Sequence, residues 1–172
     1  MSGRPHNRRG KRRRGSGGGG GPKPGSLRLQ SLGEGRFALR YPACVEERMD
    51  DFEEGVEAWK AGAIEEARDI LRFGLEGCGD NLWIHVALGR IALERDANLR
   101  LARAHFGYAL DLALRAIGRD TGALLPFEHS DNRPLYDAID GLIEVHTKGG
   151  ANGEVKALRA LRARLLGSAS PE

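Results

Sequence analysis

Small residues recur at a fixed spacing in this chain, at helical positions where a core usually carries leucine. Gly55 and Ala58 recur as Gly89 and Ala92 after 34 residues. A second set recurs after 35 residues: Ala67, Leu71 and Gly74 become Ala102, Phe106 and Ala109. A period of this length is typical of a helix pair that stacks on the next pair. We therefore expect the small residues to let helices approach closely, with Leu71 and Phe106 filling the space between them.

Apolar periodicity predicts helices over most of the chain from Val45 onward. The predicted segments are 45–61, 63–77, 81–95, 98–117, 132–148 and 152–166. Short polar side chains accept hydrogen bonds from the free N–H groups at a helix start, so Asp80 or Asn81 is expected to cap the third segment and Asn98 the fourth. Asn132, shortly before a proline, is expected to start the fifth. Short turns within each pair predict antiparallel neighbours.

The recurring frame is Gly-x2-Ala in a first helix and Ala-x3-Leu/Phe-x2-Gly/Ala in a second. This frame resembles the tetratricopeptide repeat family, and the sequence is similar to bacterial proteins of that type. The resemblance covers two repeats near 48–79 and 81–115 and a degenerate third near 132–166, within a helical domain at 45–172. It implies an all-α fold, a short α-solenoid of about three antiparallel helix pairs. An ordinary α-helical bundle is the alternative, although a bundle alone does not require the recurrence.

The resemblance also implies a concave groove, lined by the first helix of each pair, that binds a peptide or protein and performs no chemistry. The residues at the inward positions are Phe52, Val56, Trp59, Trp83, Val86 and Arg90. The best-known groove of the family clamps a carboxylate with Lys, Asn and Arg, but Phe52, Val56 and Trp83 stand at the matching positions here. What remains is a mostly apolar groove, which suits a helix or a hydrophobic peptide.

Residues 1–26 differ in composition from the rest of the chain. They carry eight Lys and Arg and no acidic residue, whereas the remainder has 19 basic and 24 acidic residues. Because this segment is rich in glycine and nearly free of apolar side chains, we expect a disordered basic tail. Its candidates for contacts with the phosphates of RNA or DNA are Arg8, Arg9, Lys11, Arg12, Arg13 and Arg14. A tail that only solubilises the protein is the other interpretation.

Residues 27–44 form an arm between the tail and the helices. Leu27 and Leu39 belong to two runs in which apolar and polar residues alternate, and Gly33 and Gly35 lie between the runs. The pattern predicts either a short β-hairpin packed against the helices or an extended arm. In both cases the arm is a candidate to fill the groove.

The two cysteines, Cys44 and Cys78, form no Cys-x-x-Cys motif. We expect no disulfide and a reducing compartment. No apolar run approaches the ~18 residues that cross a bilayer, and no apolar segment follows the basic residues at the start as in a secretory signal. The expectation is a cytoplasmic protein without a membrane partner.

The sequence predicts no catalytic residue, cofactor or metal site. His85 and His105 lie on neighbouring predicted helices with Cys78 nearby, but their spacing differs from a zinc signature. We expect both histidines to be partly buried packing residues with a hydrogen-bond partner. Seven carboxylates between Glu46 and Glu57 are interpreted as a solvated helix face near a helix start.

Together these patterns favour a non-enzymatic interaction module, an adaptor or scaffold that binds a protein or peptide in its groove. The alternative is a nucleic-acid- or ribosome-associated protein that uses the basic tail in a salt-sensitive manner. The sequence identifies neither the partner nor the oligomeric state.

Overall fold

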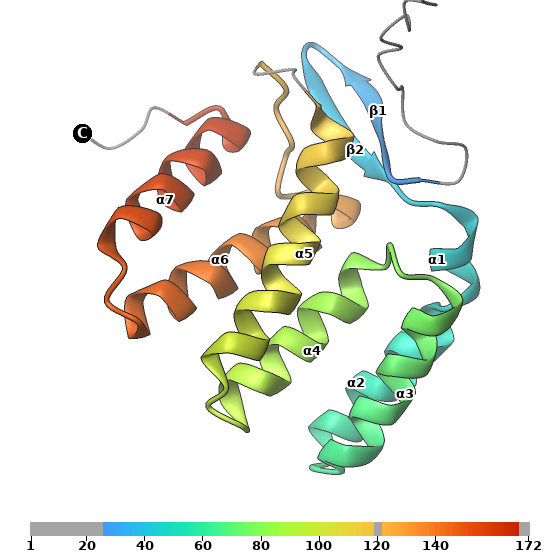
Figure 1. Ribbon diagram of the computed structural model, residues 1–172. Coiled ribbons are helices and arrows are strands. Elements are labelled where there is room, and N and C mark those ends of the chain that lie inside the picture. The colour runs from blue at the N-terminus through green and yellow to red at the C-terminus, as the bar shows by residue number, and fades with distance from the viewer. Residues whose placement is uncertain (1–25, 119–121, 169–172) are drawn as a thin grey trace, which may run out of the picture.

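The computed structural model describes residues 26–118 and 122–168, which are mostly helical with one small antiparallel sheet (Figure 1). The elements follow in the order β1 (Arg28–Gly33), β2 (Arg36–Arg40), α1 (Ala43–Glu47), α2 (Met49–Lys60), α3 (Ile64–Gly77), α4 (Leu82–Glu94), α5 (Leu99–Ile117), the 3-10 turn η1 (Ser130–Asn132), α6 (Arg133–Lys148) and α7 (Asn152–Leu166). The mainly helical fold predicted from the sequence is confirmed. None of the described helices is long and apolar enough to cross a membrane.

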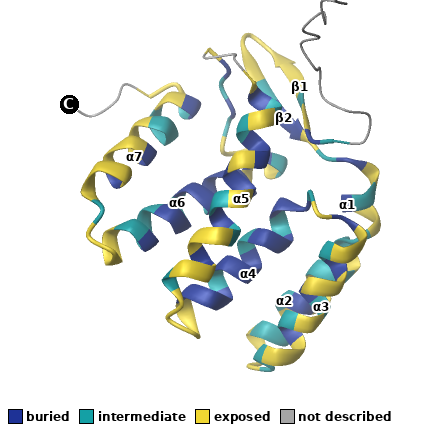
Figure 2. Cartoon of the chain, in the orientation of Figure 1, coloured by how far each residue is buried: buried dark blue, intermediate teal, exposed yellow. Residues whose placement is uncertain are grey.

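The longer helices pack as consecutive pairs, α2 on α3, α4 on α5 and α6 on α7. Figure 1 shows the pairs side by side, with α4 and α5 in the middle and the hairpin beside one end of α5. The buried side chains form two clusters. One lies between α2, α3 and α4, and the larger one joins α4, α5, α6 and α7 to the hairpin. Figure 2 shows α4 buried over most of its surface, as expected for a helix that contributes to both clusters.

The recurring glycines lie where neighbouring helices come closest. A Cβ atom on Gly55 would lie 2.6 Å from Cγ of Leu71, and one on Gly89 would lie 2.7 Å from Cε1 of Phe106. The close approach expected from the sequence is therefore present at both positions of the repeat. A Cβ on Gly141 of α6 would also meet the Phe106 ring, at 2.6 Å. Only a residue without a side chain fits at these positions, because the opposing Leu71 and Phe106 are fully buried.

The arm is a hairpin, in which β1 pairs with β2 in antiparallel register. Its buried Leu27 and Leu39 belong to the larger core cluster. Asn132 fixes it from the helical side: Oδ1 accepts from the N–H of Leu39 at 2.9 Å, and Nδ2 donates to the carbonyl of Phe37 at 3.0 Å. Since a lone hairpin is marginally stable in water, these buried contacts explain why the arm folds here.

Most predicted helix starts are correct. The side chain of Asn81 accepts from the N–H of Ile84, and that of Asn98 accepts from the N–H of Leu101, so both caps are confirmed. Asn132 directly precedes α6 as expected, but its side chain bonds to the hairpin instead of capping the helix.

The prediction of a single first helix over 45–61 is wrong, because the helix breaks at Arg48 into α1 and α2. Arg48 takes φ −112° and ψ 12°, outside the helical range. Its guanidinium pairs with Asp51 at 3.2 Å and lies 5.1 Å from the ring centroid of Phe73 on α3. The contact with Phe73 comes from another helix, so a periodicity within one segment does not encode it.

The expectation of unpaired cysteines is also wrong, because Cys44 and Cys78 form a disulfide with Cα atoms 5.5 Å apart. Cys44 lies on α1, and Cys78 follows the last residue of α3. An antiparallel pair returns the chain to its starting end, so residues separated by one helix pair become neighbours. The separation of 34 residues matches the period of the small residues, and this signal could have predicted the bond. The argument for a reducing compartment no longer holds.

Replacing Gly89 with alanine is expected to destabilise the protein by about 1–3 kcal/mol, because the buried Phe106 ring has no room to move. The matched control is Gly107→Ala, where a Cβ atom on α5 meets nothing within 4 Å. That variant is expected to be stabilised by up to about 1 kcal/mol through higher helix propensity. Urea unfolding of both variants measures the difference, and equal stabilities would contradict the packing at Gly89.

Reducing the disulfide is expected to lower the free energy of unfolding by about 3–4 kcal/mol, since the bond closes a loop of 34 residues. Urea unfolding with and without a dithiol reductant measures the loss. The double variant Cys44→Ser, Cys78→Ser should match the reduced protein. Two titratable thiols in the untreated native protein, with no effect of the reductant, would contradict the assignment.

Candidate functional site

The six residues predicted to line a groove lie on two helices that share one core cluster. All six are partly exposed: Phe52, Val56 and Trp59 on α2, and Trp83, Val86 and Arg90 on α4. The α2 residues pack against the cluster formed with α3 and α4, whereas Val86 packs against the larger cluster. Half-burial fixes these side chains while leaving part of each accessible to another molecule.

The structure brings one aromatic pair together across the two helices. The ring centroids of Phe52 and Trp83 are 5.8 Å apart, with the planes tilted by 51°. Tilted pairs at this distance are favourable beyond their burial. Because both residues are only partly buried, the pair presents an apolar surface that the protein itself does not cover completely.

A pocket of about 340 Å³ opens beside Trp83. Its lining includes the apolar side chains of Pro42, Val45 and Met49, and the charged side chains of Arg40, Glu46 and Asp131, together with Tyr41 and Ala43. The hydroxyl of Tyr41 donates to the carbonyl of Asp131 at 2.8 Å, which closes one wall. Burial, together with the charge of Asp131, raises the pKa of Tyr41, so that this hydroxyl keeps its proton.

The pocket residues between Arg40 and Met49 were not predicted as part of a site. The sequence hypothesis that the whole arm fills the groove needs correction, because the strands pack on the larger cluster while the residues that follow β2 line the pocket. The cysteine spacing was the one available signal, since the disulfide holds Cys44 between the pocket residues Ala43 and Val45.

Arg90 is not a free cation. Its Nη1 lies 3.0 Å from Oε2 of Glu144 on α6, and its guanidinium carbon lies 5.5 Å from the ring centroid of Phe106. Lys148 contacts the other carboxylate oxygen of Glu144 at 3.2 Å. Arg90 therefore joins α4 to α6, and the group of Arg90, Lys148 and Glu144 keeps one net positive charge.

His85 and His105 approach each other as the sequence suggested, with their Nδ1 atoms 3.2 Å apart. Nε2 of His85 lies 3.1 Å from the carbonyl oxygen of Gly79, which can only accept, so Nε2 carries the proton. Nδ1 of neutral His85 is then the acceptor, and Nδ1 of His105 donates. The pair is a hydrogen-bonded packing element, against which the Tyr108 ring lies at a centroid distance of 4.6 Å from His85.

Both imidazoles favour the neutral form. Burial lowers the pKa of His105 to about 4, and the charges of His85 and Arg72 act in the same direction. Burial also lowers the pKa of His85, against the hydrogen bond to Gly79 and the charge of Asp80. When both rings are protonated, two N–H groups face each other and the bond between the rings is lost.

Cys78 belongs to the disulfide, so it offers no thiolate as a metal ligand beside His85 and His105. Within residues 26–118 and 122–168, no group of three or more His, Cys, Asp or Glu side chains could hold a metal ion. The tail candidates Arg8, Arg9, Lys11, Arg12, Arg13 and Arg14 lie outside the described residues.

No protein-family model, curated protein or solved structure matches this chain.

Acidification is expected to destabilise the protein through His105, whose pKa is lower in the folded state than its ordinary value of 6.5. Between about 6.5 and about 4 the unfolded chain binds more protons, so the stability present at neutral pH is lost as the pH falls through this window. Urea unfolding over this range measures the slope. His105→Asn should flatten it, and an unchanged slope would show that His105 is not responsible.

Proposed function

We propose that this protein is a non-enzymatic interaction module of the tetratricopeptide-repeat kind, which binds a hydrophobic peptide segment on the face shared by α2 and α4. The recurrence of small residues every 34 or 35 positions, and the matching glycine contacts at Leu71 and Phe106, support the repeat. The observation that carries the function is the partly exposed pair Phe52 and Trp83 beside an open pocket.

The chemistry of this surface favours an apolar anchor on the partner. Trp83, Met49 and Val45 line the pocket beside its charged residues, and Arg90 is engaged by Glu144 of α6. Clefts that join an apolar lining to a few fixed polar groups are typical of ligand sites. Large aromatic residues in such positions commonly supply most of the binding energy. One apolar side chain of the peptide would enter the pocket, and neighbouring residues would lie along Phe52.

The charged residues of the pocket would orient the peptide. Arg40 lines the pocket together with Glu46 and Asp131, so groups of both signs are available to polar atoms of the peptide. The disulfide keeps α1 attached to the end of α3, and thereby holds this part of the lining in place before binding. Such preorganisation lowers the ordering cost of association.

Replacing Trp83 with alanine is expected to weaken peptide binding at least about tenfold, because the central aromatic contact is lost. Peptides selected from a random phage-displayed library against the full chain provide the ligand. Leu101→Ala is the control, since Leu101 is an exposed apolar residue of α5 (37% exposed) outside this pocket, and its loss should change binding less than about twofold.

A second readout places the peptide at this surface. The chain has two tryptophans, so Trp59→Phe leaves Trp83 as the sole emitter. Its fluorescence should shift to shorter wavelength as the peptide covers it. An unchanged Trp83 spectrum on saturation, or equal losses for Trp83→Ala and Leu101→Ala, would refute the proposed site.

A further inference from the structure

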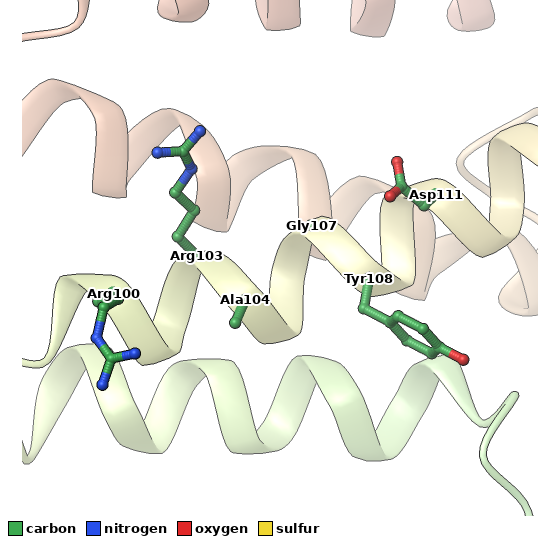
Figure 3. A pocket seen from close by; sticks show the side chains of 6 residues that line it. All are labelled: Arg100, Arg103, Ala104, Gly107, Tyr108 and Asp111. Atoms are coloured by element: carbon green, nitrogen blue, oxygen red, sulfur yellow. The ribbon is translucent and has the colours of Figure 1, made fainter.

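The outward face of α5 carries a shallow hollow that the proposed peptide site does not use. Its volume is about 380 Å³, and its lining is formed by Arg100, Arg103, Ala104, Gly107, Tyr108 and Asp111. Figure 3 shows the Arg100 and Tyr108 side chains reaching to one side of the helix, with the Arg103 and Asp111 side chains reaching to the other. Ala104 and Gly107 have little or no side chain, so the space between the longer residues stays open.

Arg100 and Arg103, the exposed arginines at this hollow, differ in their pairing from partly buried arginines of the described fold. Arg90 and Arg162 each pair with a carboxylate of α6, and Arg68 of α3 pairs with Asp96 in the loop between α4 and α5. In the described parts of the chain, no hydrogen bond or ion pair engages Arg100 or Arg103. Two exposed, unpaired guanidinium groups one helical turn apart, on opposite sides of α5 (Figure 3), are complementary to two successive phosphates of a strand that crosses the helix.

Tyr108 gives this face a second kind of contact. Tyr108 is 43% exposed. The His85 ring packs against it from the protein side, with the ring centroids 4.6 Å apart. His85 is itself held by Gly79 and His105, so the ring is fixed while part of it remains open. An accessible, immobilised aromatic ring next to cationic side chains is a platform on which a nucleic-acid base stacks.

We propose that the α5 face from Arg100 to Asp111 binds a short single-stranded segment of nucleic acid, with phosphates on Arg100 and Arg103 and one base on Tyr108. Along the helix axis, Arg100 and Tyr108 are ~12 Å apart, which leaves room for backbone and base contacts at separate positions. Asp111 repels phosphate at the far end and can accept a hydrogen bond from a base amino group. An acidic peptide would use the arginines but would not need the tyrosine ring.

This site is separate from the basic tail, and the test keeps the tail in every variant. A fluorescein-labelled twelve-nucleotide oligouridylate is titrated with the full chain by fluorescence anisotropy. Arg100→Glu with Arg103→Glu should raise Kd at least about tenfold. The charge-matched control is Arg28→Glu with Lys60→Glu, two exposed cations of β1 and α2 without a partner among the described residues, for which we expect a change below about threefold.

Three further readouts distinguish a defined binding site from nonspecific electrostatic attraction. Tyr108→Ala should raise Kd by about tenfold through the loss of stacking. Loss of two phosphate contacts should reduce the slope of log K against log salt by about 1.4. A duplex of the same length should bind more weakly than the single strand.

Four results would each overturn the proposal. The first is that the wild-type chain does not bind the oligouridylate. The second is that both double reversals weaken binding equally, which would assign the effect to net charge. Tyr108→Ala binds like the wild type, which would remove the stacking contact. Lastly, a hexaglutamate peptide competes better than the unlabelled oligonucleotide, which would assign the face to an acidic peptide.

Discussion

The Phe106 ring is the contact on which the arrangement of the central helices depends. It is fully buried on α5, and a Cβ atom on either Gly89 of α4 or Gly141 of α6 would lie within 2.7 Å of it. Because both positions are glycine, α4 and α6 can each approach the same ring closely. Arg90 lies over that ring and pairs with Glu144 of α6. One side chain of α5 thus sets the spacing of α4 and α6, and α4 in turn carries Trp83.

Two contacts, each between residues far apart in the sequence, hold the segment that lines the pocket beside Trp83. On one side, Asn132 fixes β2 through the backbone of Phe37 and Leu39. On the other, the disulfide fixes Cys44 to the end of α3. The segment between these anchors supplies four of the nine lining residues, Arg40, Tyr41, Pro42 and Ala43. A loop held at both ends loses little further entropy when a ligand binds, which suits a recognition surface.

The periodic part of the fold could be predicted from the sequence because its contacts repeat. The recurrence of small residues indicated close helix approach with Leu71 and Phe106 filling the space, and the structure places Leu71 against Gly55 and Phe106 against Gly89. The contact of Gly141 with Phe106 escaped prediction, since the loop before α6 has no counterpart in the repeat. Nor did any local pattern link Asn132 to Leu39, a hydrogen bond between residues 93 positions apart.

The resemblance to the tetratricopeptide repeat, rather than any spacing, assigned Phe52 and Trp83 to the inward positions of a groove. In the structure both are half-buried, and their rings lie in contact across α2 and α4. The partner of Arg90 and the pocket lining depend on how α6 and the segment after β2 fold back, which no spacing within one helix encodes. The cysteines were misinterpreted because compartment was inferred from their number, whereas their separation matches one helix pair.

The most direct test of this account is a nuclear Overhauser spectrum of the labelled full-length protein, recorded for the ring protons of Phe106. Since Gly89 and Gly141 both lie against that ring, the account predicts cross-peaks from it to the Hα protons of both glycines, with those protons shifted upfield by the ring current. Cross-peaks to Gly89 alone, with the Gly141 protons at ordinary shifts, would contradict it, because α6 would then not be positioned by Phe106.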